Sequence, residues 1–163
     1  GGFNFTTGEV HAVCGDTRKE DDFASFIKHT MNENPNYKKY HFVLDQLNTH
    51  KSETLVQLVA HLIGDKQDLG IKGESGILQS MKTREEYLMN PKHSIVFHYT
   101  PKHCSWLNQI EIWFGILMQK VIRRGSFIST EDLKERIFSF IDYFNESLAK
   151  PFNWTYRAKP LVE

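Results

Sequence analysis

Two short runs of apolar residues, far apart in the chain, constrain its fold more than any other feature. The first run begins at His41 and ends at Asp45, and the second covers Ile95 to Tyr99 and ends before Thr100-Pro101. Continuous apolar runs of this length are typical of central strands that are buried on both faces. Because helical patterns precede, separate and follow the two runs, we expect an α/β fold, a mixed sheet flanked by helices.

The expected helices have recognisable ends. Ser52 is a candidate N-cap for the helix that follows the first apolar run, and Gly64 is its candidate C-terminal stop. Ser105 and Ser129 are candidate caps for two later helices. The sequence therefore predicts helices at about 20–34, 52–64, 105–122 and 129–144, preceded by a β-hairpin over Phe3–Cys14.

Residues from about 64 to 93 differ in character from the rest. Glycines punctuate a charged stretch, and Thr83-x-x-Glu86 has the pattern of a capping box for a short helix that would end at Asn90-Pro91. We interpret this segment as an insertion rather than a domain. We expect it to be mobile and surface-exposed, outside the hydrophobic core.

Composition limits the class of protein. The 163 residues suit one domain, and the 20 basic residues balance the 20 acidic residues, so the formal net charge is zero. A free-standing DNA-binding module is usually basic, so a nucleic-acid role would depend on a local site. The sequence has no apolar run long enough to cross a bilayer, and its start is no signal peptide. Cys14 and Cys104 lack C-x-x-C spacing, which suits a reducing compartment.

Two acidic residues are candidates for chemistry. Asp45 follows a predicted strand, where α/β folds place reactive groups, although aspartate is equally common at the start of a turn. Glu111 lies in a helix that is apolar on nearly every side, so we expect it to be buried with a tertiary basic partner or a metal ion. Carboxylate oxygens are the ligands that Mg²⁺ and Mn²⁺ prefer, and two such ions can activate water on a phosphodiester.

Longer stretches around both acidic residues resemble a known family. The stretch Val43–Ser52, VLDQLNTHKS, is similar to the second-aspartate motif of IS630-type transposases. The stretch Tyr99–Phe114, YTPKHCSWLNQIEIWF, is similar to their third-carboxylate motif. The family's closing segments resemble residues 123–127, 144–145 and 150–155. The resemblance therefore spans essentially the whole chain.

This resemblance implies an RNase H-like fold and a DDE endonuclease, which cleaves transposon ends with metal-activated water and then transfers strands into target DNA. It assigns Asp45 and Glu111 as catalytic metal ligands, with two Mg²⁺ or Mn²⁺ ions as cofactors. It also implies DNA as the partner, a homodimer when assembled on DNA, and a cytoplasmic, nucleoid-associated prokaryotic protein without membrane contact.

The family's first catalytic aspartate and its N-terminal helix-turn-helix have no counterpart in the sequence. That aspartate would lie on a central strand, so we interpret residues 1–163 as a partial catalytic domain with the insertion at about 64–93. We expect this chain by itself to fold poorly and not to cleave DNA. The alternative is an inactive remnant that only binds DNA or another transposase, and an unrelated RNase H-like nuclease is disfavoured by the match around Glu111.

Basic and polar residues near Glu111 are candidates for DNA contacts, namely Lys102, His103, Asn108, Lys120, Arg123 and Arg124. For Lys120, Arg123 and Arg124, a solvated basic helix end is an equally good explanation. His50 could approach the metal ions, but a plain turn histidine is the simpler interpretation.

Two further patterns favour structural roles. Trp106 and Trp113 are expected in the core rather than stacked on bases. A zinc site built on His11 and Cys14 is disfavoured, because residues three apart in a strand point to opposite faces.

Overall fold

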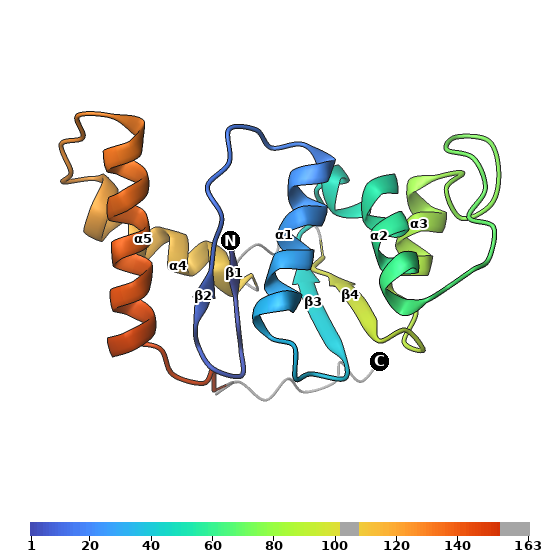
Figure 1. The fold of residues 1–163 in the computed structure, drawn as a ribbon, viewed down its shortest axis with the longest axis horizontal. Helices are drawn as coiled ribbons and strands as arrows, with labels where there is room; N and C mark the ends of the chain where they lie inside the picture. Colours follow the sequence, from blue (N-terminus) through green and yellow to red (C-terminus); the bar gives the residue numbers. More distant parts are fainter. Residues whose placement is uncertain (102–107, 154–163) are drawn as a thin grey trace, which may run out of the picture. The chain divides into compact units, whose positions relative to one another are not determined.

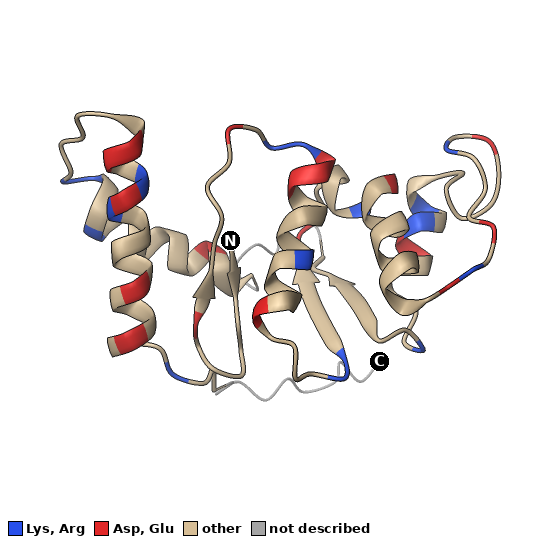
Figure 2. Cartoon of the chain, in the orientation of Figure 1, with Lys and Arg blue, Asp and Glu red and all other residues tan. Residues whose placement is uncertain are grey.

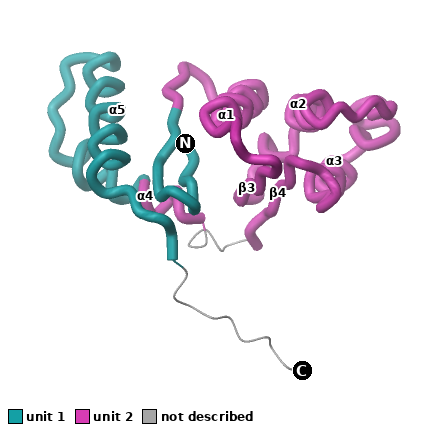
Figure 3. The backbone as a smooth tube through the Cα atoms, turned by 60° about the horizontal axis from the view of Figure 1, so that its bottom comes forward, with its two compact units in different colours: residues 1–12, 114–163 teal, residues 13–113 magenta. Residues whose placement is uncertain are grey.

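The computed structural model describes residues 1–101 and 108–153, and in this part of the chain short strands alternate with five α-helices (Figure 1). The α/β class expected from the sequence is confirmed. The chain divides into two compact units, one made of residues 1–12 and 114–163 and the other of residues 13–113 (Figure 3). Among the described helices, none has the length and apolar character needed to span a membrane.

The unit of residues 13–113 is a parallel strand pair covered by helices. Strands β3 (Tyr40–Leu44) and β4 (Ile95–Tyr99) pair in parallel, with Tyr40 opposite Ile95 and Leu44 opposite Tyr99. The elements around them are α1 (Glu20–Glu33), the 3₁₀ turn η1 (Asn48–Lys51), α2 (Glu53–Ile63) and α3 (Met81–Leu88). Buried residues of α1, α2, α3 and β4 share one hydrophobic core. The core therefore lies on the helix-covered side of the strand pair.

The unit of residues 1–12 and 114–163 combines a hairpin with α5 (Thr130–Ser147). Strand β1 (Gly2–Phe3) pairs antiparallel with β2 (Val10–His11), and both strands are shorter than the predicted hairpin. The Asn145 side chain of α5 accepts a hydrogen bond from Val10 N at 2.8 Å and donates one to Val10 O at 2.9 Å. Gly8 has a φ of +81°, and a Cβ there would lie 2.0 Å from Lys150 O, so the turn requires glycine.

The predicted ends of two helices are confirmed. Ser52 Oγ caps α2 by accepting a hydrogen bond from Leu55 N at 3.2 Å, and Gly64 ends the helix in the left-handed region with a φ of +71°. Ser129 Oγ caps α5 through the Asp132 amide at 3.1 Å. These signals are local in sequence, so they are readable without knowledge of the packing.

Part of the segment at residues 64–93 belongs to the core, so our expectation that the segment lies outside the core is wrong. Leu78, Tyr87 and Leu88 are buried in the same cluster as residues of α2 and β4. The helix also begins earlier than predicted, at Met81, because Ser80 is the N-cap and Thr83 closes the capping box from the third helical position. The segment therefore combines charged residues with a small apolar face that packs into the core.

Among the described residues, strand β3 is covered on one face, whereas we expected both faces to be buried. Phe42 and Leu44 pack against the core, but His41 and Val43 lie on an exposed face. Neighbouring strand residues point to opposite faces, so an apolar run does not by itself establish that both are covered. The prediction is closer for β4, where residues 95–97 are all buried.

Stability is expected to depend on pH through His93. Its Nδ1 is buried without a hydrogen-bond partner among the described residues, and its ring packs against Tyr87, with centroids 4.7 Å apart. Burial lowers the pKa of His93, and Asp65 opposes this shift to a lesser extent. The unfolded chain, with a histidine pKa of about 6.5, therefore binds the proton first as pH falls.

In the natural full-length protein, the free energy of unfolding should consequently decrease between about pH 7.5 and 5.5, measured by urea denaturation. The variant His93→Phe should show a weaker pH dependence. The matched variant His61→Phe, at an exposed position on α2, should keep the original dependence. Identical pH dependence in the two variants would contradict this account.

Candidate active site

Asp45 is the first residue after β3, at the carboxyl edge of the parallel strand pair, as predicted. Its Oδ1 accepts a hydrogen bond from Leu47 N at 3.1 Å, which closes a local turn. The same oxygen lies 2.7 Å from Nδ1 of His50. Both contacts fall on one oxygen, so within the described part of the chain Oδ2 remains open to a ligand.

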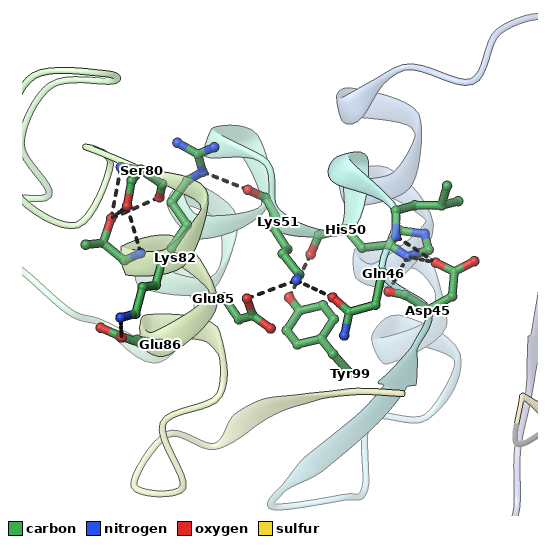
Figure 4. Close-up of polar contacts among 12 residues, drawn as sticks. Asp45, Gln46, His50, Lys51, Ser80, Lys82, Glu85, Glu86 and Tyr99 are labelled. Carbon is green, nitrogen blue, oxygen red and sulfur yellow. Dashed lines mark hydrogen bonds and ion pairs between the residues drawn. The ribbon is translucent and has the colours of Figure 1, made fainter. Parts of the chain in front are cut away.

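His50 is more than a plain turn residue. Its ring lies against Phe23 of α1, with centroids 4.2 Å apart, and its Nδ1 faces the Asp45 carboxylate (Figure 4). Its backbone carbonyl accepts a hydrogen bond from the Tyr99 hydroxyl at 2.8 Å. The imidazole therefore lies between Phe23 of α1 and the Asp45 carboxylate, while the Tyr99 hydroxyl fixes the His50 backbone, and the ring restricts the orientation of Asp45.

Lys51 is 7% exposed, which is unusual for lysine. Its Nζ lies 2.9 Å from Glu85 Oε2, donates a hydrogen bond to Gln46 Oε1 at 2.6 Å, and sits 4.6 Å from the centre of the Tyr99 ring. These partners offset the high cost of burying an ammonium group. Burial, together with the Glu85 charge, raises the pKa of Tyr99, so its hydroxyl stays protonated as a donor.

Glu111 is exposed in the first turn of α4 (Gln109–Leu117), so our prediction of a buried carboxylate is wrong. Asn108 Nδ2 lies 3.5 Å from its Oε1. Of the apolar residues of this helix, Trp113 and Leu117 are buried, as expected for Trp113, whereas Ile112 is 52% exposed. Apolar residues on several sides of a helix therefore do not imply that all these sides are covered. A carboxylate in the first turn is also favoured by the helix dipole.

Lysine and arginine side chains of the described residues leave both carboxylates unpaired. Within residues 1–101 and 108–153, Asp45 and Glu111 form no ion pair with lysine or arginine, and Lys51 points to Glu85 instead. In the same part of the chain, no group of three or more His, Cys, Asp or Glu side chains is arranged to hold a metal ion. The two carboxylates thus have the chemistry that a divalent cation requires, without an assembled three-ligand centre in the described residues.

Three of the candidate DNA contacts lie on η3 (Met118–Ile122) and just after it. Lys120, Arg123 and Arg124 are all exposed. The expected single helix to Ile122 changes its hydrogen-bond pattern after Leu117, because η3 is π-helical. Figure 2 shows basic and acidic residues interspersed along α3 and α5, in keeping with the zero net charge. The candidates Lys102 and His103, together with Cys104, Ser105 and Trp106, fall outside the described residues.

One protein family matches the part of the chain that contains most of these candidate residues. A family model described as DDE superfamily endonuclease matches residues 1–134, a range that contains Asp45, His50 and Glu111. No curated protein and no solved structure matched the chain.

Proposed function

The chain belongs to the DDE superfamily endonucleases, and from this premise we propose that it forms catalytic-domain structure of an IS630-type transposase. The motifs around Asp45 and Glu111 support the narrower assignment, because they resemble that type over long stretches. An RNase H-like fold, with the first catalytic aspartate on a further strand, is part of the proposal. So are DNA cleavage at transposon ends and strand transfer into target DNA.

The placement of Asp45 carries this proposal. Its carboxylate follows β3 at the edge where parallel strands of α/β folds carry reactive groups, and its only cation-capable partner among the described residues is His50. We assign Asp45 and Glu111 as ligands of Mg²⁺ or Mn²⁺. Two such ions, when bound, would favour ionisation of the attacking water and stabilise the leaving oxygen of the phosphodiester.

The polypeptide has its own tasks in this reaction. His50 and the local turn restrict the orientation of the Asp45 carboxylate, and Asn108 contacts Glu111. We assign DNA backbone contacts to the exposed Lys120, Arg123 and Arg124, because a chain without net charge needs a local basic site for phosphate. Assembly as a homodimer on two transposon ends completes the proposal.

The test is a nicking assay on supercoiled DNA that carries the sequences flanking the gene, with the natural full-length protein. We expect nicking in Mg²⁺ or Mn²⁺ and none in a chelator, because the proposed mechanism relies on bound metal ions to activate water. Binding to this DNA without nicking in either metal would instead favour the alternative, an inactive module that binds DNA or another transposase.

A further inference from the structure

Helix α3, within the segment at residues 64–93, contacts the loop that follows Asp45 through polar side chains. Arg84 of α3, itself 8% exposed, donates from Nε to the Lys51 carbonyl at 2.7 Å and from Nη1 to the Leu78 carbonyl at 3.0 Å. Its neighbour Glu85 holds the Lys51 ammonium at 2.9 Å. Helix α3 therefore contacts both the backbone carbonyl and the side-chain ammonium group of Lys51 in η1 (Figure 4).

The same ammonium group fixes the residue next to Asp45. Lys51 Nζ donates to Gln46 Oε1 at 2.6 Å, and Gln46 Nε2 donates to the Thr100 carbonyl at 2.8 Å. Both ends of the Gln46 amide are thus occupied, one by the Glu85–Lys51 pair and the other by the residue after β4. Hydrogen bonds of Gln46 and the ion pair of Lys51 therefore fix the loop from Asp45 to Lys51 near its start and at its end.

These contacts hold the side of the loop that faces away from the carboxylate. Asp45 and His50 face each other on one side, while Gln46 and Lys51 face α3 and Tyr99 on the other (Figure 4). A loop anchored on one side presents the other side in a fixed geometry. A metal ligand held in one orientation binds its ion more tightly than one that must first be ordered.

We propose that Glu85 is a positioning residue for the Asp45 carboxylate, acting through Lys51 on Gln46 and on the turn that carries His50. The proposal rests on the proposed function, because it takes Asp45 as a metal ligand. Stability alone explains this pair of a buried lysine and a partly exposed glutamate poorly, since apolar residues of similar volume commonly replace buried ion pairs without loss of stability. The segment at 64–93 thus acquires a role at the site, although it contributes no ligand.

The test compares Mn²⁺ affinity, followed by electron paramagnetic resonance of the free ion, in variants of the natural full-length protein. Glu85→Gln removes the charge that holds Lys51. The double variant Lys51→Met, Glu85→Met removes both charges of the pair together, so that no buried charge is left unpaired, and is expected to keep the fold. The matched control is Glu86→Gln, on the same helix, where Glu86 is 65% exposed and lies 4.0 Å from Lys82. A cooperative thermal melt establishes that each variant is folded.

We expect Mn²⁺ affinity to fall about tenfold in Glu85→Gln and in the double variant, and to stay unchanged in Glu86→Gln. The nitrogen resonances of the His50 imidazole in metal-free protein should shift in the first two variants and not in the control. A residue that serves stability alone would change neither quantity in folded protein. Should Glu85→Gln not fold, the double variant decides the question.

Two results would overturn the proposal, and they are distinguishable. A folded double variant with the original Mn²⁺ affinity and unshifted His50 resonances would refute the positioning role alone, provided that Asp45→Asn weakens Mn²⁺ binding. Equal Mn²⁺ affinity in Asp45→Asn and the original protein would refute the metal role of Asp45, and the positioning role with it.

Discussion

Replacing Leu88 with alanine is expected to lower the free energy of unfolding by about 2–5 kcal/mol. Leu88 is 0% exposed at the end of α3 and belongs to the core cluster that includes Val59 of α2 and Phe97 of β4. Truncating its side chain removes buried apolar surface and leaves a cavity that the neighbours fill only in part. Domains are typically stable by about 5–15 kcal/mol, so this single change would remove a large share.

Urea denaturation measures this effect, with Met89→Ala as the matched control. Met89 follows Leu88 directly, is 43% exposed, and should change stability by no more than about 0.5 kcal/mol. Replacing residues 65–91 with a flexible linker should abolish cooperative unfolding, because Leu78 and Tyr87 leave the core as well. Equal losses for Leu88→Ala and Met89→Ala, or a cooperative transition after that replacement, would show that this segment is peripheral.

The contrast between the helix ends and the segment at 64–93 shows which parts of the fold are predictable from sequence. Ser52 and Gly64 act on backbone groups within a few residues, so their roles are written in adjacent positions. The burial of Leu78 and Leu88 depends on contacts with helices and strands that are distant in sequence. Glycines and charges dominate the segment, and its apolar residues are too widely spaced to show a periodic face.

At the candidate site, the predicted position of Asp45 at a strand end is confirmed, whereas the predicted burial of Glu111, which depends on packing, is wrong. Asp45 follows β3 as expected, because an apolar run that stops at a carboxylate marks the end of a strand. Glu111 is exposed because the sequence does not specify which sides of an apolar helix are covered. Glu85 and Lys51 lie in different helical segments, and no sequence pattern predicts a contact between them. Only the structure therefore reveals this contact.

Asp45→Asn and Glu111→Gln are each expected to reduce metal-dependent DNA cleavage by more than about 100-fold. Loss of an outer-shell partner of a metal ligand costs about 10–100-fold, so loss of a direct ligand should cost more. Folding and DNA binding should persist, since neither carboxylate pairs with lysine or arginine in the described part of the chain. Glu131→Gln, at an exposed glutamate in the first turn of α5, is the matched control and should cleave normally. A clear loss of metal-free thermal stability in Glu111→Gln, with cleavage retained, would mark Glu111 as structural.

Cysteine at the same two positions tests most directly whether these carboxylates bind the metal ions. A thiolate is a poor ligand for Mg²⁺, which is a hard cation, whereas Mn²⁺ accepts softer ligands more readily. DNA cleavage by Asp45→Cys and by Glu111→Cys is therefore measured in each metal, beside the original protein. We predict that both variants are inactive in Mg²⁺ and regain part of their activity in Mn²⁺, while the original protein cleaves in both. Cleavage by either cysteine variant in Mg²⁺ at the level of the original protein would contradict the assignment of that residue as a metal ligand.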